Sequence, residues 1–284
     1  MSFWLELPME LRYMILDYLD NETKMNFGSC SLKSFECFLN YLSNIDSIFI
    51  LNGIIEKIRM KQRKADISFK VRENSITCAL GSSKFQIEHS TMTKILDDFQ
   101  GKILKKSNFS ILTIRGDVNV DNFQSLHNLK TLNLEDCDED TALFFINKAE
   151  NLKNLFLLPN KNSENGIANC QKIFNIEQAE IYGVQFNDDQ FLQFESSKLF
   201  IENGYITENG INAFIENWSK SENKQGFVYF MIDGRNITMP NWIGSEEFVE
   251  QRSDGSYLIK NRSNGSLGVY SQNGSNGVMF RIMG

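Results

Sequence analysis

Apolar residues recur at helical spacing near the start of the chain. Four of them lie four, one and three positions apart, which places them along one stripe of a helix: Leu11, Ile15, Leu16 and Leu19. Pro8 precedes them, in the first helical turn, where a residue without a backbone N–H group is tolerated. Polar residues then end this pattern, and two further helical patterns follow. The sequence therefore predicts three short helices within residues 1–45.

A module of this size cannot cover all of its own apolar side chains. Small domains keep a large share of their surface exposed, so part of the stripe is expected to remain at the surface. Exposed apolar patches of this kind often mark contacts with a partner protein. The alternative interpretation is that residues 3–45 form an ordinary helical cap on a larger globular domain.

A degenerate repeat occupies the middle of the chain. Each copy is a short segment of alternating apolar residues, and the copies begin at residues 112, 132, 155, 179, 199 and 230. The first four spacings are 20, 23, 24 and 20 residues, within the period of about 20–29 residues in leucine-rich repeats, and the last is 31. Apolar residues at helical spacing lie between several copies. The pattern predicts a short leucine-rich-repeat-like β/α solenoid.

Turn residues dominate the last third of the chain. Short apolar runs are separated there by Asp254-Gly255, Asn264-Gly265, Asn273-Gly274 and Asn276-Gly277. Such dipeptides favour the positive φ angles of tight hairpins, so this region is expected to be an antiparallel β meander. Residues 46–108 are expected to form a transition segment, helical over 54–64 and then in strands near 67–71, 76–80 and 85–87.

The N-terminal pattern resembles a known motif. The run Leu7-Pro8-x-x-Leu11-x-x-x-Ile15-Leu16-x-x-Leu19, followed by Cys30-Ser31 and Phe35, resembles the F-box. In that family a three-helix module binds a Skp-type adaptor of cullin–RING ubiquitin ligases. The resemblance implies adaptor-binding residues Leu7, Pro8, Leu11, Ile15, Leu16, Leu19, Phe27, Cys30 and Phe35.

Two later segments carry a second resemblance. Residues 206–218 and 252–259 look like motifs of the F-box-associated (type 2) domain of nematode F-box proteins, although Leu258 stands where that family usually has a small residue. The resemblance implies a non-catalytic substrate receptor, with residues 1–45 on the adaptor and 109–284 on a protein substrate. The expected fold class is α+β: a three-helix F-box, a leucine-rich-repeat-like β/α solenoid and a C-terminal antiparallel β meander.

Charge and composition narrow the class of partner. The net charge of −7 and pI near 5.1 argue against nucleic acid, because phosphate binding needs clustered cations. No apolar run approaches the length of a membrane span. The five cysteines form no C-x-x-C pair, which favours reduced thiols and a cytoplasmic or nuclear location.

The sequence contains no motif for catalysis or cofactor binding that we could identify. Its two histidines have no Cys or carboxylate at metal-ligand spacing, and there is no phosphate-binding loop or nucleophile elbow. The carboxylates over 135–140 lack the Gly and terminal Glu of a calcium loop, so we interpret them as the acidic start of a helix. We expect no catalytic residue, metal or cofactor. A non-ligase interaction scaffold or decoy is the alternative function, and an enzyme of unfamiliar type is less supported.

The repeat strands also predict a binding surface. If the first residues of the copies point into the core, the alternate residues face the other side of the sheet. On the later strands these residues form an apolar and aromatic band: Phe156, Leu158, Tyr182, Phe200, Tyr229 and Met231. We expect this band to bind the substrate. The alternative is that the C-terminal meander covers the band, so that these side chains are part of the hydrophobic core.

Overall fold

The computed structural model describes residues 45–52, 54–60, 66–72, 75–80, 83–88, 104, 109–123, 126–160, 166–202, 205–220, 229–233, 249–273 and 277–283. The chain divides into two compact units, residues 1–129 and 130–284. The expected three-helix module lies, up to residue 44, outside the described residues. The expected division of roles at 108/109 stays a prediction, because compactness does not test it.

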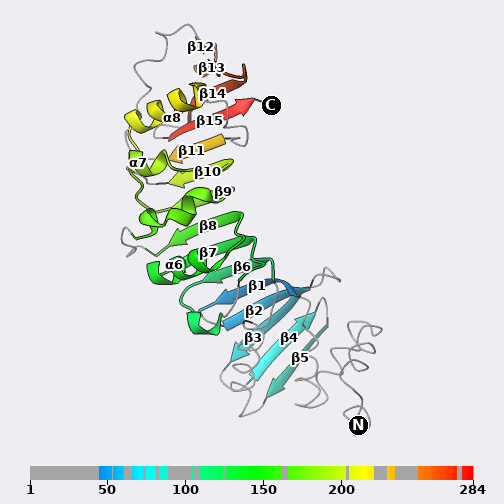
Figure 1. Cartoon of the computed structure of the whole chain (residues 1–284). Helices are drawn as coiled ribbons and strands as arrows, with labels where there is room; N and C mark the ends of the chain where they lie inside the picture. The colour runs from blue at the N-terminus through cyan, green and yellow to red at the C-terminus, as the bar shows by residue number, and fades with distance from the viewer. Residues whose placement is uncertain are drawn as a thin grey trace. The chain divides into compact units, whose positions relative to one another are not determined.

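A twisted mixed sheet forms the first unit (Figure 1). Its strand order is β6-β1-β2-β3-β4-β5, with β1 and β6 parallel and the other neighbours antiparallel. The strands are β1 (Ile45–Leu51), β2 (Ile54–Met60), β3 (Asp66–Arg72), β4 (Ser75–Leu80), β5 (Ser83–Glu88) and β6 (Ile111–Arg115). A single-turn 3-10 helix, η1 (Val120–Asn122), follows β6. The strands expected near 67–71, 76–80 and 85–87 correspond to β3, β4 and β5.

The helix predicted over residues 54–64 is wrong, because residues 54–60 form strand β2. Ile55 and Ile58 are three residues apart and both buried, a spacing that imitates a helix. In the sheet, Ile50 pairs with Ile55 and Ile48 pairs with Ile58, with a register shift between the two pairs. A bulge of this kind adds a residue to one strand and returns two side chains three positions apart to the same face.

The second unit is built on a longer mixed sheet, in the order β12-β13-β14-β15-β11-β10-β9-β8-β7. Strands β7 to β11 are parallel and the remaining neighbours are antiparallel. The parallel strands are β7 (Thr131–Cys137), β8 (Asn154–Pro159), β9 (Gln178–Tyr182), β10 (Lys198–Glu202) and β11 (Tyr229–Asp233). The antiparallel ones are β12 (Val249–Gln251), β13 (Tyr257–Lys260), β14 (Leu267–Asn273) and β15 (Gly277–Met283).

Helical segments connect the parallel strands and lie along one side of the sheet (Figure 1). They are α6 (Glu139–Lys148), the 3-10 turns η2 (Ile167–Asn169) and η3 (Gln171–Asn175), α7 (Asp188–Phe191) and α8 (Glu208–Lys220). Three phenylalanines from α7, α8 and β11 contact one another with ring centroids 5.0–5.4 Å apart: Phe191, Phe214 and Phe230. This cluster holds the two helices against the inner face of the sheet.

The fold class predicted from the sequence is wrong. The described residues are mostly β, in mixed sheets, and the connections between the parallel strands do not repeat one strand-plus-helix unit. Strand β8 is followed by two 3-10 turns, and β9 by a helix of only four residues. The described residues therefore form mixed β sheets rather than the alternating strand and helix layers of a β/α solenoid.

The side chains of the parallel strands nevertheless alternate as the sequence predicts. The inward residues, from Leu132 and Leu134 in β7 to Phe230 and Ile232 in β11, are all buried. Two of the predicted hairpin turns also lie where Gly255 and Gly265 adopt positive φ angles of 81° and 74°. Local patterns therefore predicted the strands correctly, although the architecture built from them differs.

Candidate functional site

The outward face of β7 to β11 carries its side chains in rows that run across the strands. Backbone register aligns corresponding residues of neighbouring strands, and the alternation of a strand places every second residue on this face. The first row is polar: Thr131, Asn154, Gln178 and Lys198. The middle row is Asn133, Phe156, Glu180, Phe200 and Met231. The third row holds Glu135, Leu158, Tyr182 and Glu202.

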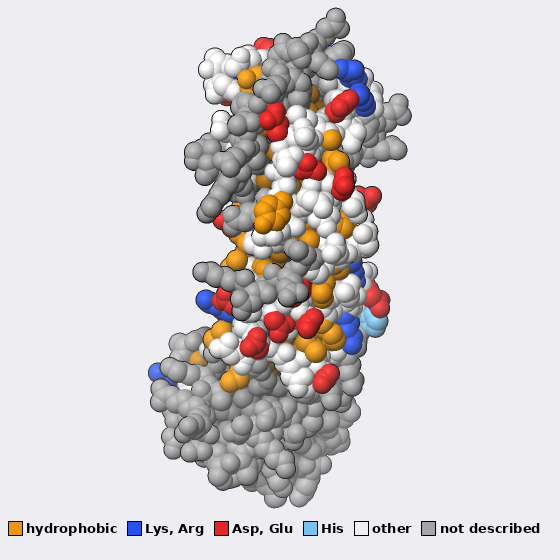
Figure 2. Space-filling view, turned by 90° about the vertical axis from the view of Figure 1, so that its left-hand side faces the viewer, with side chains coloured by type: hydrophobic (Ala, Val, Ile, Leu, Met, Phe, Trp, Pro, Cys, Tyr) orange, Lys and Arg blue, Asp and Glu red, His pale blue; other side chains and the backbone are white. Residues whose placement is uncertain are grey.

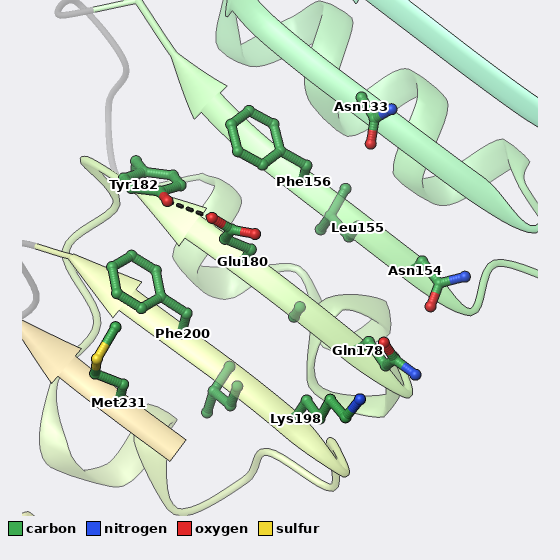
Figure 3. Close-up of a pocket in the computed structure, with 12 residues that line it drawn as sticks. Asn133, Asn154, Leu155, Phe156, Gln178, Glu180, Tyr182, Lys198, Phe200 and Met231 are labelled. Carbon is green, nitrogen blue, oxygen red and sulfur yellow. Dashed lines mark hydrogen bonds between the residues drawn. The ribbon is translucent and has the colours of Figure 1, made fainter. Parts of the chain in front are cut away.

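A shallow hollow of about 520 Å³ lies over this face. Its lining combines the amides of the first row with the aromatic and acidic side chains of the middle and third rows (Figure 3). On the helix side of the molecule, hydrophobic side chains are scattered among acidic and polar ones (Figure 2). The outward sheet face, which carries the hollow, is therefore the candidate binding surface of the second unit.

Three aromatic rings on adjacent strands form a continuous contact in the hollow. The rings of Phe156 and Tyr182 have centroids 5.4 Å apart and an interplanar angle of 49°, and those of Tyr182 and Phe200 are 5.0 Å apart at 47°. All three side chains are half-buried. Because they come from paired strands, the rings hold one another in place and leave their remaining surface to solvent.

Polar contacts order the side chains around the rings. The Tyr182 hydroxyl donates a hydrogen bond to Oε1 of Glu180. In the first row, Nδ2 of Asn154 donates to Oγ1 of Thr131 over 3.1 Å. The outward residues of β7 to β11 whose side chains are described include three glutamates, Glu135, Glu180 and Glu202, but one cation, Lys198. On these five strands the described acidic side chains therefore outnumber the basic ones.

Most of the predicted substrate-binding band lies on this face. Phe156, Tyr182, Phe200 and Met231 are half-buried, Leu158 is 38% exposed, and the side chain of Tyr229 lies outside the described residues. Strand β15 pairs edge to edge with β11, so the described C-terminal strands extend the sheet and do not lie over the band. The role of the band in substrate binding stays a prediction.

The structure does not test the predicted adaptor-binding residues. They lie outside the described residues: Leu7, Pro8, Leu11, Ile15, Leu16, Leu19, Phe27, Cys30 and Phe35.

Sequence reasoning did not select the polar members of the hollow. Asn133, Asn154, Gln178, Glu180 and Lys198 line it together with the aromatic residues. Each has the same outward parity as the band, so parity together with strand register could have identified them.

The chemical groups in the hollow suit binding of a polypeptide. Amide, carboxylate, ammonium and aromatic groups can hold a chain by hydrogen bonds, ion pairs and stacking. No group of three or more His, Cys, Asp or Glu side chains that could hold a metal ion is found among the described residues. Nor is any helix in the described part of the chain both long and apolar enough to cross a membrane.

Comparison with known families gives one match. Residues 169–226 match the model of a family described as F-box associated. The match spans α7, β9, β10 and α8, and it includes Tyr182 and Phe200 of the hollow. It supports an F-box-associated domain in this part of the chain. No curated protein and no solved structure gives a significant match.

Proposed function

We propose that this chain is the substrate-recognition subunit of a Skp–cullin–F-box ubiquitin ligase. In this role residues 1–45 are an F-box that binds the Skp-type adaptor, and the domain over 109–284 binds a protein substrate. The observation that carries the proposal is the F-box-associated match, because it covers β9 and β10, the strands that bring Glu180, Tyr182 and Phe200 to the hollow.

Under this proposal the N-terminal module and the domain over 109–284 bind different partners. The adaptor contacts are the apolar residues of the N-terminal pattern, with Leu11 and Ile15 at its centre. The substrate contacts are the residues of the band, with Phe156, Tyr182 and Phe200 as aromatic anchors on a hydrogen-bonded sheet. Half-buried aromatic anchors on a rigid element are typical of protein-binding hot spots.

The protein itself would catalyse nothing. Modules of the F-box-associated type bind substrates, and other subunits of the ligase transfer ubiquitin. Such a receptor acts in the cytoplasm, in the nucleus or in both.

Capture of the adaptor tests the proposal. The Leu11→Ala, Ile15→Ala double variant should weaken adaptor binding by about 2–5 kcal/mol, because two deeply buried aliphatic side chains are truncated at the interface. That loss corresponds to roughly thirty-fold or more in dissociation constant, measured by titrating the purified full-length chain with the adaptor. Circular dichroism of the variant reports whether the remainder of the chain stays folded.

The matched control changes the band in the domain over 109–284 and leaves the N-terminal module unchanged. The Phe156→Ala, Phe200→Ala double variant should bind the adaptor as the unchanged protein does and should lose substrate capture. Adaptor binding that survives the N-terminal double variant in a folded protein contradicts the assignment of the F-box. If the chain captures partners through the hollow without any adaptor binding, it is an interaction scaffold or decoy instead.

A further inference from the structure

Glu180 occupies the centre of the hollow. In the middle row it pairs with Phe156 on one side and Phe200 on the other. Tyr182, two residues further along β9, contacts both of these rings. Figure 3 shows the carboxylate of Glu180 on the strand between those of the two phenylalanines. One carboxylate is thus surrounded by three aromatic side chains from three adjacent strands.

Among the described residues, the Glu180 carboxylate has a hydrogen bond that orients it and no cation that neutralises it. The Tyr182 hydroxyl donates to Oε1 of Glu180, while Oε2 accepts no hydrogen bond from the part of the chain that the structure describes. Glu180 also forms no ion pair with a described lysine or arginine, and its side chain is exposed. A negative charge held in this way can accept a charge-assisted hydrogen bond from an incoming cation.

The surrounding rings favour the same kind of ligand. The face of an aromatic ring attracts a cation through its quadrupole, and arginine uses this contact more often than lysine. The rings of Phe156, Tyr182 and Phe200 line the hollow together with the Glu180 carboxylate. The outward residues of β7 to β11 include three described glutamates and one lysine, and Arg281 of β15, which pairs with Tyr229, adds a basic residue at the margin of this face. Beside Glu180 an acidic or phosphorylated segment would therefore be repelled.

We propose that the hollow binds a basic segment of a partner protein, and that an arginine or lysine side chain of this segment enters between Phe156 and Phe200 and pairs with Glu180. The identification of that partner as a ubiquitination substrate rests on the proposed function, whereas the binding itself does not.

Apolar residues beside the basic one complete the recognised pattern. Leu158 on β8 and Met231 on β11 lie toward the two ends of the band. Parallel strands are about 4.8 Å apart, so three strand spacings correspond to about 14 Å, the length of about four residues of extended chain. Strand β9, which carries Glu180, is one spacing from β8 and two spacings from β11. The partner segment therefore carries an apolar residue about one or two positions from its basic residue on one side and about three positions away on the other.

Selection from a random-peptide display library on the full-length chain tests this inference. The unchanged protein should enrich peptides with an arginine or lysine flanked by apolar residues. Synthetic peptides with the enriched sequence, and the same peptides with glutamine or glutamate in place of the basic residue, are then compared by fluorescence anisotropy. The basic peptide should bind at least about tenfold more tightly than the glutamine peptide, and raised salt should reduce the difference.

The central variant is Glu180→Gln, which removes the charge and keeps an oxygen for the Tyr182 hydrogen bond. It should abolish the preference for the basic peptide over the glutamine peptide. Glu195→Gln is the matched control, because Glu195 is exposed outside the hollow and the substitution changes net charge equally. The control should bind as the unchanged protein does.

Three results would overturn the inference: no enrichment of basic residues, enrichment of acidic ones, or an unchanged preference in Glu180→Gln. Failure here is distinct from failure of the proposed function. Adaptor capture without a preference for basic peptides removes only this inference. A preference for basic peptides that depends on Glu180, without adaptor capture, removes the ligase role and keeps the binding site.

Discussion

Gly210 shows how one residue joins two helices of the second unit. It lies in the first turn of α8, where a Cβ atom would be 2.3 Å from Oδ1 and 2.9 Å from Cβ of Asp188. Asp188, in α7, accepts hydrogen bonds from the backbone N–H of Thr207 over 2.7 Å and from its hydroxyl over 2.6 Å. The missing side chain therefore allows the Asp188 carboxylate to hold the start of α8.

Replacement of this glycine should destabilise the protein. In Gly210→Ala the new methyl group displaces Asp188 and breaks its bonds to Thr207, which should lower the free energy of unfolding by about 1–3 kcal/mol. Alanine alone would favour the helix by up to about 1 kcal/mol. In an Asp188→Ala background, Gly210→Ala should therefore be neutral or stabilising. Denaturant unfolding of the two single variants and the double variant measures this, and equal losses in both backgrounds would contradict the explanation.

At the level of a secondary-structure element, side-chain carboxylates accept backbone hydrogen bonds at the start of helix α6. Asp138 is the N-cap, and its Oδ1 accepts a hydrogen bond from the backbone N–H of Thr141 over 2.7 Å. Glu139, in the first turn, accepts another from the N–H of Ile167 over 2.7 Å. Two members of the acidic cluster that was predicted to begin a helix thus accept hydrogen bonds from backbone N–H groups, one in α6 itself and one in η2.

Loss of the N-cap should be measurable. Asp138→Ala leaves the N–H of Thr141 without this partner, so the free energy of unfolding should fall by about 0.5–2 kcal/mol. Asp138→Asn is the matched control, because its amide oxygen can accept the same bond, and it should remain close to the unchanged protein. Thermal and denaturant unfolding distinguish them. If Asp138→Asn lowers the free energy of unfolding as much as Asp138→Ala does, the effect comes from the negative charge at the helix start and not from the hydrogen bond.

At the scale of the whole molecule, the pairing of strands predicts where the second unit is most stable. Strand β10 is paired on both sides along all of its residues, and β9 along all but Tyr182 on its β8 side, whereas β12 has three residues and one described neighbour. Amide hydrogen exchange should therefore be slowest in β9 and β10 and fastest in the hairpin of β12 and β13. Mass spectrometry of the intact chain measures this order. Equal protection of β12 and β9 would show that the edge is stabilised by contacts beyond its pairing.

Local sequence patterns were enough to predict the parallel strands of the second unit and which of their residues are buried. An alternation of two residues is a local property, so Leu132 and Leu134 indicate an inward face without knowledge of their neighbours. The same reasoning identified Phe156, Tyr182 and Phe200 as outward residues. Tight turns at Gly255 and Gly265 were predictable for an equally local reason, the positive φ angle that glycine tolerates.

Features that depend on pairing between distant segments became visible only in the folded chain. Residues 54–60 became a strand because β1 pairs with them through a bulge, which no local period reveals. The C-terminal meander extends the sheet because β15 pairs with β11. Glu180 stands among aromatic rings because strand register brings Phe156, 24 residues earlier, and Phe200, 20 residues later, to its two sides. Register is set by the burial of whole strands, and that is a property of the assembled sheet.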